Sequence, residues 1–164
     1  MLSPDRPRCF QLHLADERQT ARLGAALARL LGPGDTVLLR GELGAGKSAL
    51  ARAVIGAALG DPQAEIPSPS YTLVNIYETA RGPVWHADLY RLTGAAEELE
   101  ELGLVETMGA ALVLVEWPER LGTALPARHL DIALTAPRAG GRDAAITLNG
   151  PGWDTVAGLL ETWR

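Results

Sequence analysis

The stretch GELGAGKS, residues 41–48, combines glycines, a lysine and a hydroxyl at the spacing of a phosphate-binding loop, G-x-x-x-x-G-K-[ST]. Glycines let the backbone wrap closely around phosphate groups, and a helix that begins there presents its free amides to the anion. Lys47 is the only lysine among the 15 Lys and Arg residues. Its compact ammonium reaches β- and γ-phosphates in a cradle that the wide guanidinium of arginine fits less well. The residues predicted to bind the nucleotide are Glu42, Leu43, Gly44, Ala45, Gly46, Lys47, Ser48 and Ala49.

Two oxygen-bearing side chains are candidate ligands for Mg²⁺ beside that loop. Ser48 ends the motif with a hydroxyl, and Glu116 follows five consecutive apolar residues, 111–115, in ALVLVEW. In proteins with a phosphate-binding loop, an acidic residue at the tip of a buried strand binds Mg²⁺, usually through water, or orients the attacking water. Aspartate is commoner there, and a charge that simply ends a strand in solvent is the alternative. Because the loop is present, we predict that Ser48 and Glu116 bind the metal.

A proline-bearing loop supplies further hydroxyls. The segment SPSYTLV, residues 68–74, is a kinked entry into a strand, and Thr72 lies within it. Many enzymes with a phosphate-binding loop sense the γ-phosphate through Mg²⁺ with a Thr or Ser in such a loop. A capped turn with half-buried hydroxyls is the alternative interpretation.

The segment HADLYRL, residues 86–92, offers one more carboxylate. Asp88 ends a short predicted strand and is either a second carboxylate for Mg²⁺ or water, or a strand-end cap. His86 alternates with Asp88 and is interpreted as a packed histidine. Arg91 contacts phosphate in one interpretation and pairs with Glu97 or Glu98 in the other.

The order of apolar patterns predicts an α/β fold. Two strands are expected to be nearly all apolar, as buried parallel strands are. The strand at 36–40 directly precedes the glycine loop, and the strand at 110–117 carries Glu116. Helices are expected at 16–31 with Asp16 as N-cap, 47–59, 95–104 and 153–163. Further strands are expected at 8–14, 71–78, 83–88, 129–136 and 143–150. We predict one P-loop NTPase-like domain, residues 1–164, whose mostly parallel sheet is flanked by helices and includes some antiparallel strands.

Composition limits the compartment and the partners. The chain has 20 acidic and 15 basic residues, net charge −5, so we expect no strong binding of RNA or DNA by the chain itself. The single cysteine, Cys9, excludes an internal disulfide. The first ten residues lack an apolar signal core, and the longest apolar run, 108–115, is too short to span a bilayer. We therefore expect a cytoplasmic protein with no membrane partner.

The sequence lacks the motifs that define several other classes of nucleotide-dependent protein. A GTPase needs N-K-x-D for guanine, which a chain with a single lysine cannot contain at another place, and D-x-x-G is absent. No LSGGQ-like segment of an ABC-type ATPase is present. A small-molecule kinase stays open, although its usual arginine-bearing lid would have only Arg120 and Arg128. A nucleotide-sensing module without catalysis, which would keep Lys47 and tolerate loss of Glu116, stays open too.

Five segments in order, GELGAGKS, SPSYTLVNIYE, HADLYRL, EELEELGLVE and VLVEWPER, make the chain resemble the TsaE (formerly YjeE) family of bacterial P-loop ATPases. That family acts in making threonylcarbamoyladenosine on tRNA. The similarity runs from about residue 41 to residue 120, and the part after Arg120 matches only loosely. Ser70 stands where the family usually has threonine, and Ser48 where it often has threonine. Both serines keep a hydroxyl.

The resemblance implies an ATPase that uses ATP and Mg²⁺ and acts on a complex of TsaD and TsaB homologues. That complex transfers the threonylcarbamoyl group to adenosine 37 of tRNA, so tRNA is met only indirectly. Catalytic roles are implied for Lys47, Thr72, Asp88 and Glu116, with Trp117 near the nucleotide. Because no internal arginine finger is evident, we expect slow hydrolysis by the chain alone and a partner that completes the site. The acidic run 97–101 is most simply a solvated helix face, with a docking surface as the alternative.

Overall fold

The computed structural model describes residues 6–164, so the predicted lack of a signal core in residues 1–10 falls partly outside the described part. Within it, the strands are β1 (Arg8–Leu14), β2 (Thr36–Arg40), β3 (Val74–Thr79), β4 (Gly82–Asp88), β5 (Leu112–Glu116), β6 (His129–Thr135) and β7 (Arg142–Asn149). The helices are α1 (Glu17–Leu30), α2 (Lys47–Ala58), α3 (Ala96–Leu102), α4 (Leu104–Thr107) and α5 (Asp154–Glu161), with a 3₁₀ segment η1 (Pro118–Ala124).

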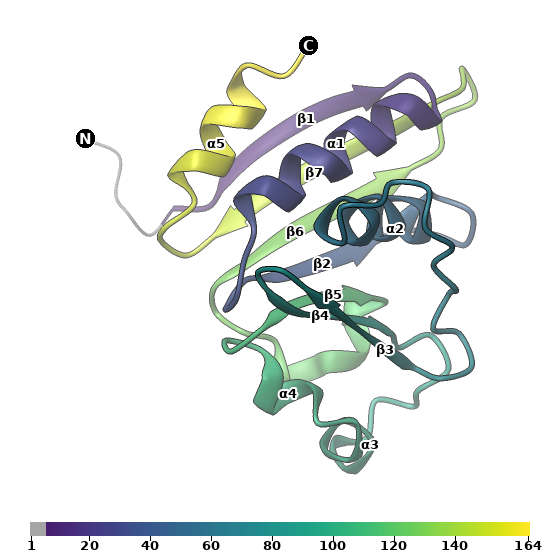
Figure 1. Ribbon diagram of the computed structural model, residues 1–164, viewed down its shortest axis with the longest axis vertical. Coiled ribbons are helices and arrows are strands. Elements are labelled where there is room, and N and C mark those ends of the chain that lie inside the picture. The colour runs from purple at the N-terminus through teal and green to yellow at the C-terminus, as the bar shows by residue number, and fades with distance from the viewer. Residues whose placement is uncertain (1–5) are drawn as a thin grey trace.

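The strands form one sheet in the order β1-β7-β6-β2-β5-β4-β3 (Figure 1). The central strands β6, β2, β5 and β4 are parallel to one another, whereas β1, β7 and β3 pair with their neighbours antiparallel. This arrangement confirms the predicted fold class. Because the parallel strands end at the same edge of the sheet, their carboxyl ends bring residues from distant segments together.

Alternation along the central strands divides the core into two layers. In β2, Val37 and Leu39 face the layer that contains α1, α2 and α5, while Leu38 faces the layer beneath α3, α4 and η1. Helix α1 begins as predicted, because the Asp16 carboxylate accepts a hydrogen bond from the Gln19 amide at 3.0 Å. All three central-strand positions are at most 2 % exposed, so the sheet that carries the loop is held from both sides.

Close packing of α1 on α2 fixes the helix that follows the glycine loop. A Cβ added to Gly24 on α1 would lie 2.4 Å from the Cβ of Ala53 on α2. Real Cβ atoms do not approach so closely, so a side chain at residue 24 would push the two helices apart.

Two predicted elements differ from the structure. The strand predicted at 71–78 begins only at Val74, because residues before it form a turn in which Leu73 has φ 68°. The helix predicted at 95–104 is broken into α3 and α4 at Gly103, whose φ of 67° ends a right-handed helix.

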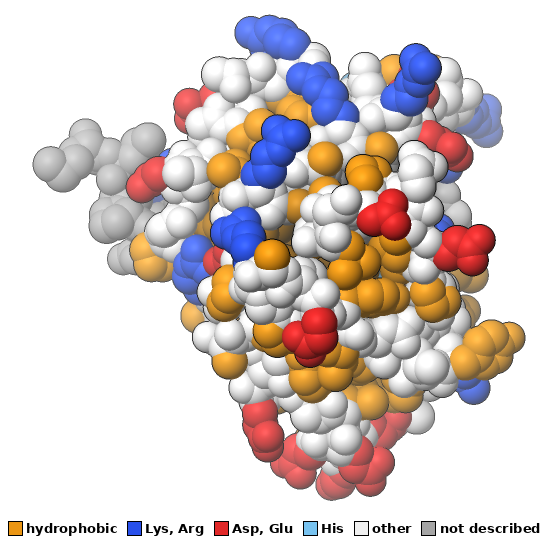
Figure 2. Space-filling view, viewed as in Figure 1, with side chains coloured by type: hydrophobic (Ala, Val, Ile, Leu, Met, Phe, Trp, Pro, Cys, Tyr) orange, Lys and Arg blue, Asp and Glu red, His pale blue; other side chains and the backbone are white. Residues whose placement is uncertain are grey.

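The surface carries its acidic charge unevenly. Figure 2 shows Asp and Glu side chains gathered at the end of the molecule where Figure 1 places α3, and Lys and Arg side chains mainly at the other end. Glu97, Glu100 and Glu101 are exposed, as expected for a solvated helix face. Among residues 6–164, no helix combines the length and the apolar character that crossing a membrane requires.

Candidate functional site

The glycine loop connects the end of β2 to the start of α2 in a conformation that demands glycine. Gly41 has φ 146°, and a Cβ there would lie 2.6 Å from the carbonyl oxygen of Leu134 on β6. Gly46 adopts φ 105° immediately before α2. The first amides of α2 have no partner within their own helix, so they are available to an anion held by the loop.

The side chain of Lys47 is held by the loop itself. Its ammonium donates hydrogen bonds to the carbonyl oxygens of Gly41 (2.6 Å) and Glu42 (2.8 Å) and lies 4.4 Å from the ring centroid of Trp117. Lys47 is only 5 % exposed. An ammonium has three donors, so two fix its position and one is left for a ligand.

Ser48 and Glu116 meet although 68 residues separate them. Glu116 ends β5, which pairs in parallel with β2 so that Glu116 lies opposite Leu39. The Ser48 hydroxyl on α2 donates to Oε1 of Glu116 at 2.7 Å. Because the hydroxyl hydrogen points to Glu116, the oxygen lone pairs of Ser48 remain available to a cation.

Glu116 is buried and yet ionised. It is 1 % exposed, and burial by itself would raise the pKa of its carboxyl group. Hydrogen bonds from His86 and Ser48, together with the charges of His86 and Lys47, outweigh burial and lower the pKa below its ordinary value. The carboxylate therefore keeps its negative charge beside Lys47.

Asp88 is the neighbour of Glu116 on the adjacent strand. The two residues are paired in the parallel register of β4 and β5. Asp88 is 8 % exposed, and its Oδ1 accepts a hydrogen bond from the Tyr90 amide at 3.0 Å. Burial raises the pKa of Asp88, the nearby charge of Glu116 raises it further, and the Tyr90 bond, His86 and Lys47 oppose that shift. The site thus holds two carboxyl groups with opposite pKa shifts.

Two cavities flank the glycine loop. One, of about 270 Å³, brings together Lys47, Ser48, Asp88 and Glu116. The other, of about 550 Å³, lies between the loop and the end of β6. Its wall consists of residues 41–45, Trp117, Glu119 and residues 133–136. A nucleotide whose phosphates lie on the loop could therefore extend into either cavity.

Trp117 separates the two cavities and has an unusual backbone. It lines both, and its φ is 58°, one of two positive values among the non-glycine residues described. The other is Leu73, which follows the loop whose Ser68 and Ser70 line the first cavity. Such conformations cost of order 1–3 kcal/mol and gather at functional sites. The ring also packs against that of Tyr90, with the centroids 4.8 Å apart and the ring planes tilted by 47°.

Not every predicted residue joins this cluster. The exposed Thr72 does not line either cavity, and its hydroxyl donates to Asn75 at 2.7 Å. Ser68 and Ser70 from the same loop line the first cavity instead. A catalytic role for Thr72 stays a prediction. Arg91 donates to the Ser70 carbonyl and lies over the ring of Tyr71, so it braces the loop.

Sequence reasoning missed two residues of the site. Arg52, one turn beyond Lys47 on α2, lines the first cavity, and nothing in the motif points to it. His86, interpreted as a packed histidine, is indeed fully buried, but its Nε2 lies 2.6 Å from Oε2 of Glu116. The signal was its spacing of two residues from Asp88, which places both side chains on one face of β4.

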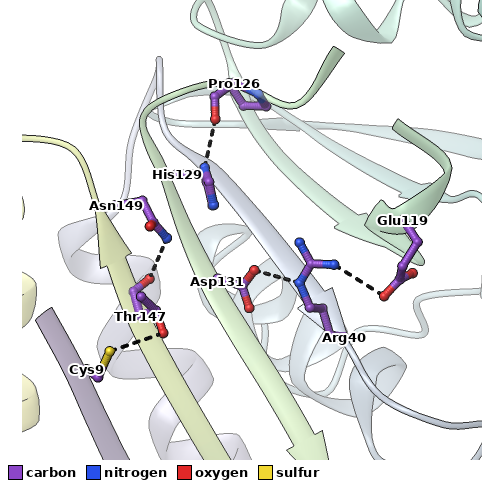
Figure 3. A network of polar contacts seen from close by, with 8 residues as sticks. All are labelled: Cys9, Arg40, Glu119, Pro126, His129, Asp131, Thr147 and Asn149. Atoms are coloured by element: carbon purple, nitrogen blue, oxygen red, sulfur yellow. Dashed lines mark hydrogen bonds and ion pairs between the residues drawn. The ribbon is translucent and has the colours of Figure 1, made fainter. Parts of the chain in front are cut away.

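The entry to the loop is anchored by an arginine at the end of β2. Figure 3 shows Arg40 between Asp131 of β6 and Glu119 of η1. Its Nε donates to Asp131 at 2.6 Å, and a terminal nitrogen donates to Glu119 at 3.3 Å. These contacts tie the segment just before Gly41 to two neighbouring elements, so the loop starts from a fixed position.

Comparisons with known proteins point to one family. A family model described as "Threonylcarbamoyl adenosine biosynthesis protein TsaE" matches residues 14–144, well beyond the segment in which the resemblance was expected. A tRNA threonylcarbamoyladenosine biosynthesis protein TsaE from Rickettsia felis is 42 % identical over 108 residues, which cover 66 % of this chain but only 62 % of that protein. A protein of the same name from Nostoc sp. is 35 % identical over 159 residues, 93 % of this chain and 92 % of that one.

A solved structure shares the fold. The crystal structure of Bacillus subtilis YdiB superposes with a TM-score of 0.74 and 25 % sequence identity. The superposition covers 95 % of this chain and 96 % of YdiB.

Proposed function

The chain belongs to the TsaE family, and on that premise we propose that it binds and hydrolyses ATP with Mg²⁺ in the synthesis of threonylcarbamoyladenosine on tRNA. The observation that carries this proposal is the convergence of Lys47, Ser48 and Glu116 at one cavity beside the glycine loop. Each of these side chains is held by a hydrogen bond of 2.8 Å or less, so the protein itself fixes their arrangement.

The phosphates would lie on the loop amides and Lys47. The buried ammonium and the N-terminus of α2 supply positive charge, and the two carbonyls that hold Lys47 fix its direction. The cavity next to residues 133–136 would receive the nucleoside, because it adjoins the loop on the side away from Asp88. The absence of a guanine-specific motif favours adenine.

Mg²⁺ fits the oxygen atoms beside Lys47. It prefers oxygen ligands and commonly uses one or two carboxylates, with phosphate oxygens and water as the rest. Ser48 would bind it through a lone pair, since its hydrogen is donated to Glu116, and Glu116 would act directly or through water. Within residues 6–164, no group of three or more His, Cys, Asp and Glu forms a metal site by itself. When bound, Mg²⁺ would neutralise charge on the β- and γ-phosphates.

Hydrolysis would use Asp88 and Glu116 on the γ-phosphate side of the cavity, where a carboxylate orients the attacking water. Two arginines beside the glycine loop have other tasks: Arg40 pairs with Asp131 and Glu119, and Arg142 donates to the carbonyl oxygens of Gly44 and Gly141. Arg52 lines the cavity itself. We propose that a complex of TsaD and TsaB homologues completes the site and that tRNA is met through that complex.

The test is phosphate release from MgATP by the purified protein, with and without a TsaD–TsaB pair from the same source. Lys47→Ala serves as the control, because it removes the ammonium that holds the phosphates. We expect slow release that the pair stimulates and that the variant loses. Release at tens of turnovers per second by the protein alone would refute the need for a partner. ATP consumption that ignores the pair but rises with a small-molecule acceptor would favour a kinase instead.

A further inference from the structure

Among the described residues, His86 forms a single side-chain hydrogen bond, which joins it to Glu116. His86 is completely buried, and its Nε2 lies 2.6 Å from Oε2 of Glu116. Because a carboxylate only accepts hydrogen bonds, the hydrogen of this contact is on Nε2. The second ring nitrogen, Nδ1, has no hydrogen-bond partner among the described residues. The polar function of this buried ring is therefore directed at Glu116.

The contact follows from the register of the parallel strands. His86 lies opposite Leu114, and Asp88 lies opposite Glu116, so His86 reaches forward along the sheet to the carboxylate at the end of β5. Glu116 then has one donor on each oxygen: Ser48 from α2 on Oε1 and His86 from β4 on Oε2. Two donors from two rigid elements determine both the position and the plane of the carboxylate.

We infer that His86 is a positioning residue that orients Glu116, and through it Ser48, for Mg²⁺ and nucleotide. This inference rests on the proposed function. Without His86, the flexible glutamate side chain would be tied at Ser48 alone, and it would be free to turn about its own bonds. Partners that hydrogen-bond metal-site carboxylates in this way typically contribute 10- to 100-fold in metal affinity or activity.

The alternative is a histidine that only fills space between the strands. In that case leucine, which has a similar volume, would replace it without effect on the metal. Glutamine separates the two possibilities, because its amide nitrogen reaches about as far from Cβ as Nε2 of histidine and keeps the donor. His129, the first residue of β6, offers a matched control: it is also buried, at 8 % exposure, and its ring donates to the carbonyl oxygen of Pro126 instead of to Glu116 (Figure 3).

The experiment measures ADP affinity by calorimetry in EDTA and in Mg²⁺ for wild type, His86→Leu, His86→Gln and His129→Leu. Mg²⁺ should raise the ADP affinity of His86→Leu about 10-fold less than it raises that of wild type. In EDTA, the ADP affinities of the two proteins should agree within about twofold. His86→Gln should recover most of the gain, and His129→Leu should keep all of it. In ATP hydrolysis with the partner pair, kcat/KM for MgATP should follow the same order.

Several outcomes would overturn the inference. These are a full Mg²⁺ effect in His86→Leu, equal losses in His86→Leu and His129→Leu, or no recovery in His86→Gln. If wild-type protein binds ADP no better with Mg²⁺ than without it, the proposed function and this inference both fail. If wild type shows the Mg²⁺ effect and the variants do not behave as expected, only this inference fails. If His86→Leu does not fold, the wild-type protein decides: NMR should show a slowly exchanging Nε2–H of His86, and its absence would refute the contact.

Discussion

Replacing Glu116 with glutamine should separate the chemistry of the site from its stability. The shape of the side chain is kept, but both of its present partners, His86 and Ser48, are donors. Glutamine has one accepting oxygen and one donating amide, so one of the two partners must accept where it now donates. The hydrogen bonds also lose the charge of the carboxylate, which together costs about 1.5–3 kcal/mol.

The relief of desolvation offsets part of that loss of stability. Glu116 is 1 % exposed, and removing a charge from such a position relieves its desolvation. We therefore expect a net loss of about 1–2 kcal/mol in the free energy of unfolding, which for a chain of 164 residues lowers Tm by about 2–8 °C. The fold survives this change, so any loss of hydrolysis can be assigned to the site.

The assay pairs thermal unfolding with phosphate release in the presence of the partner proteins. We expect kcat to fall about 100-fold, because the carboxylate that orients the metal and the attacking water is gone. Glu78→Gln is the matched control: it makes the same chemical change at an exposed position on β3, and it should alter stability by less than about 0.5 kcal/mol. A folded Glu116→Gln protein with kcat within about twofold of wild type would refute the assignment of Glu116 to the catalytic machinery.

Three further predictions concern charge, space and pH. Lys47→Arg should weaken ADP binding by at least about 10-fold in calorimetry, because the planar fork does not fit a site of 5 % exposure; equal affinity would contradict the loop geometry. For Gly24→Ala, the clash with Ala53 should cost about 1–3 kcal/mol and the better helix propensity of alanine should return about 1 kcal/mol, so urea unfolding should show a net loss of up to about 2 kcal/mol; higher stability would show that the helices can separate. Since the pKa of Glu116 is lowered in the folded state, its ionisation adds stability above the ordinary carboxyl pKa of 4.5 that is lost as pH falls through the folded value. Below pH 4.5, Tm of wild type should therefore fall more steeply than that of Glu116→Gln. The raised pKa of Asp88, to which the charge of Glu116 contributes, acts in the opposite direction and reduces this difference.

Local patterns in the sequence were sufficient for most of the secondary structure. Asp16 caps α1 because its side chain bonds an amide three residues away, and β2 and β5 are recognisable because buried parallel strands are apolar throughout. The errors arose where the backbone turns left-handed, at Leu73 and Gly103. A positive φ depends on what surrounds the turn as well as on the residue, and a hydrophobic pattern does not report it.

The phosphate-binding loop is recognisable from the sequence alone, because all of its parts, from Gly41 to Ser48, are contiguous and act through their own backbone and side chains. Which distant residues join the loop depends on how the chain folds. Glu116 reaches Ser48 across 68 positions, and His86 reaches Glu116 across 30, through the register of β2, β5 and β4. Thr72 fits the motif but lies outside the cavity. Strand register is set by the packing of the whole sheet against both helix layers, so no short segment encodes it alone.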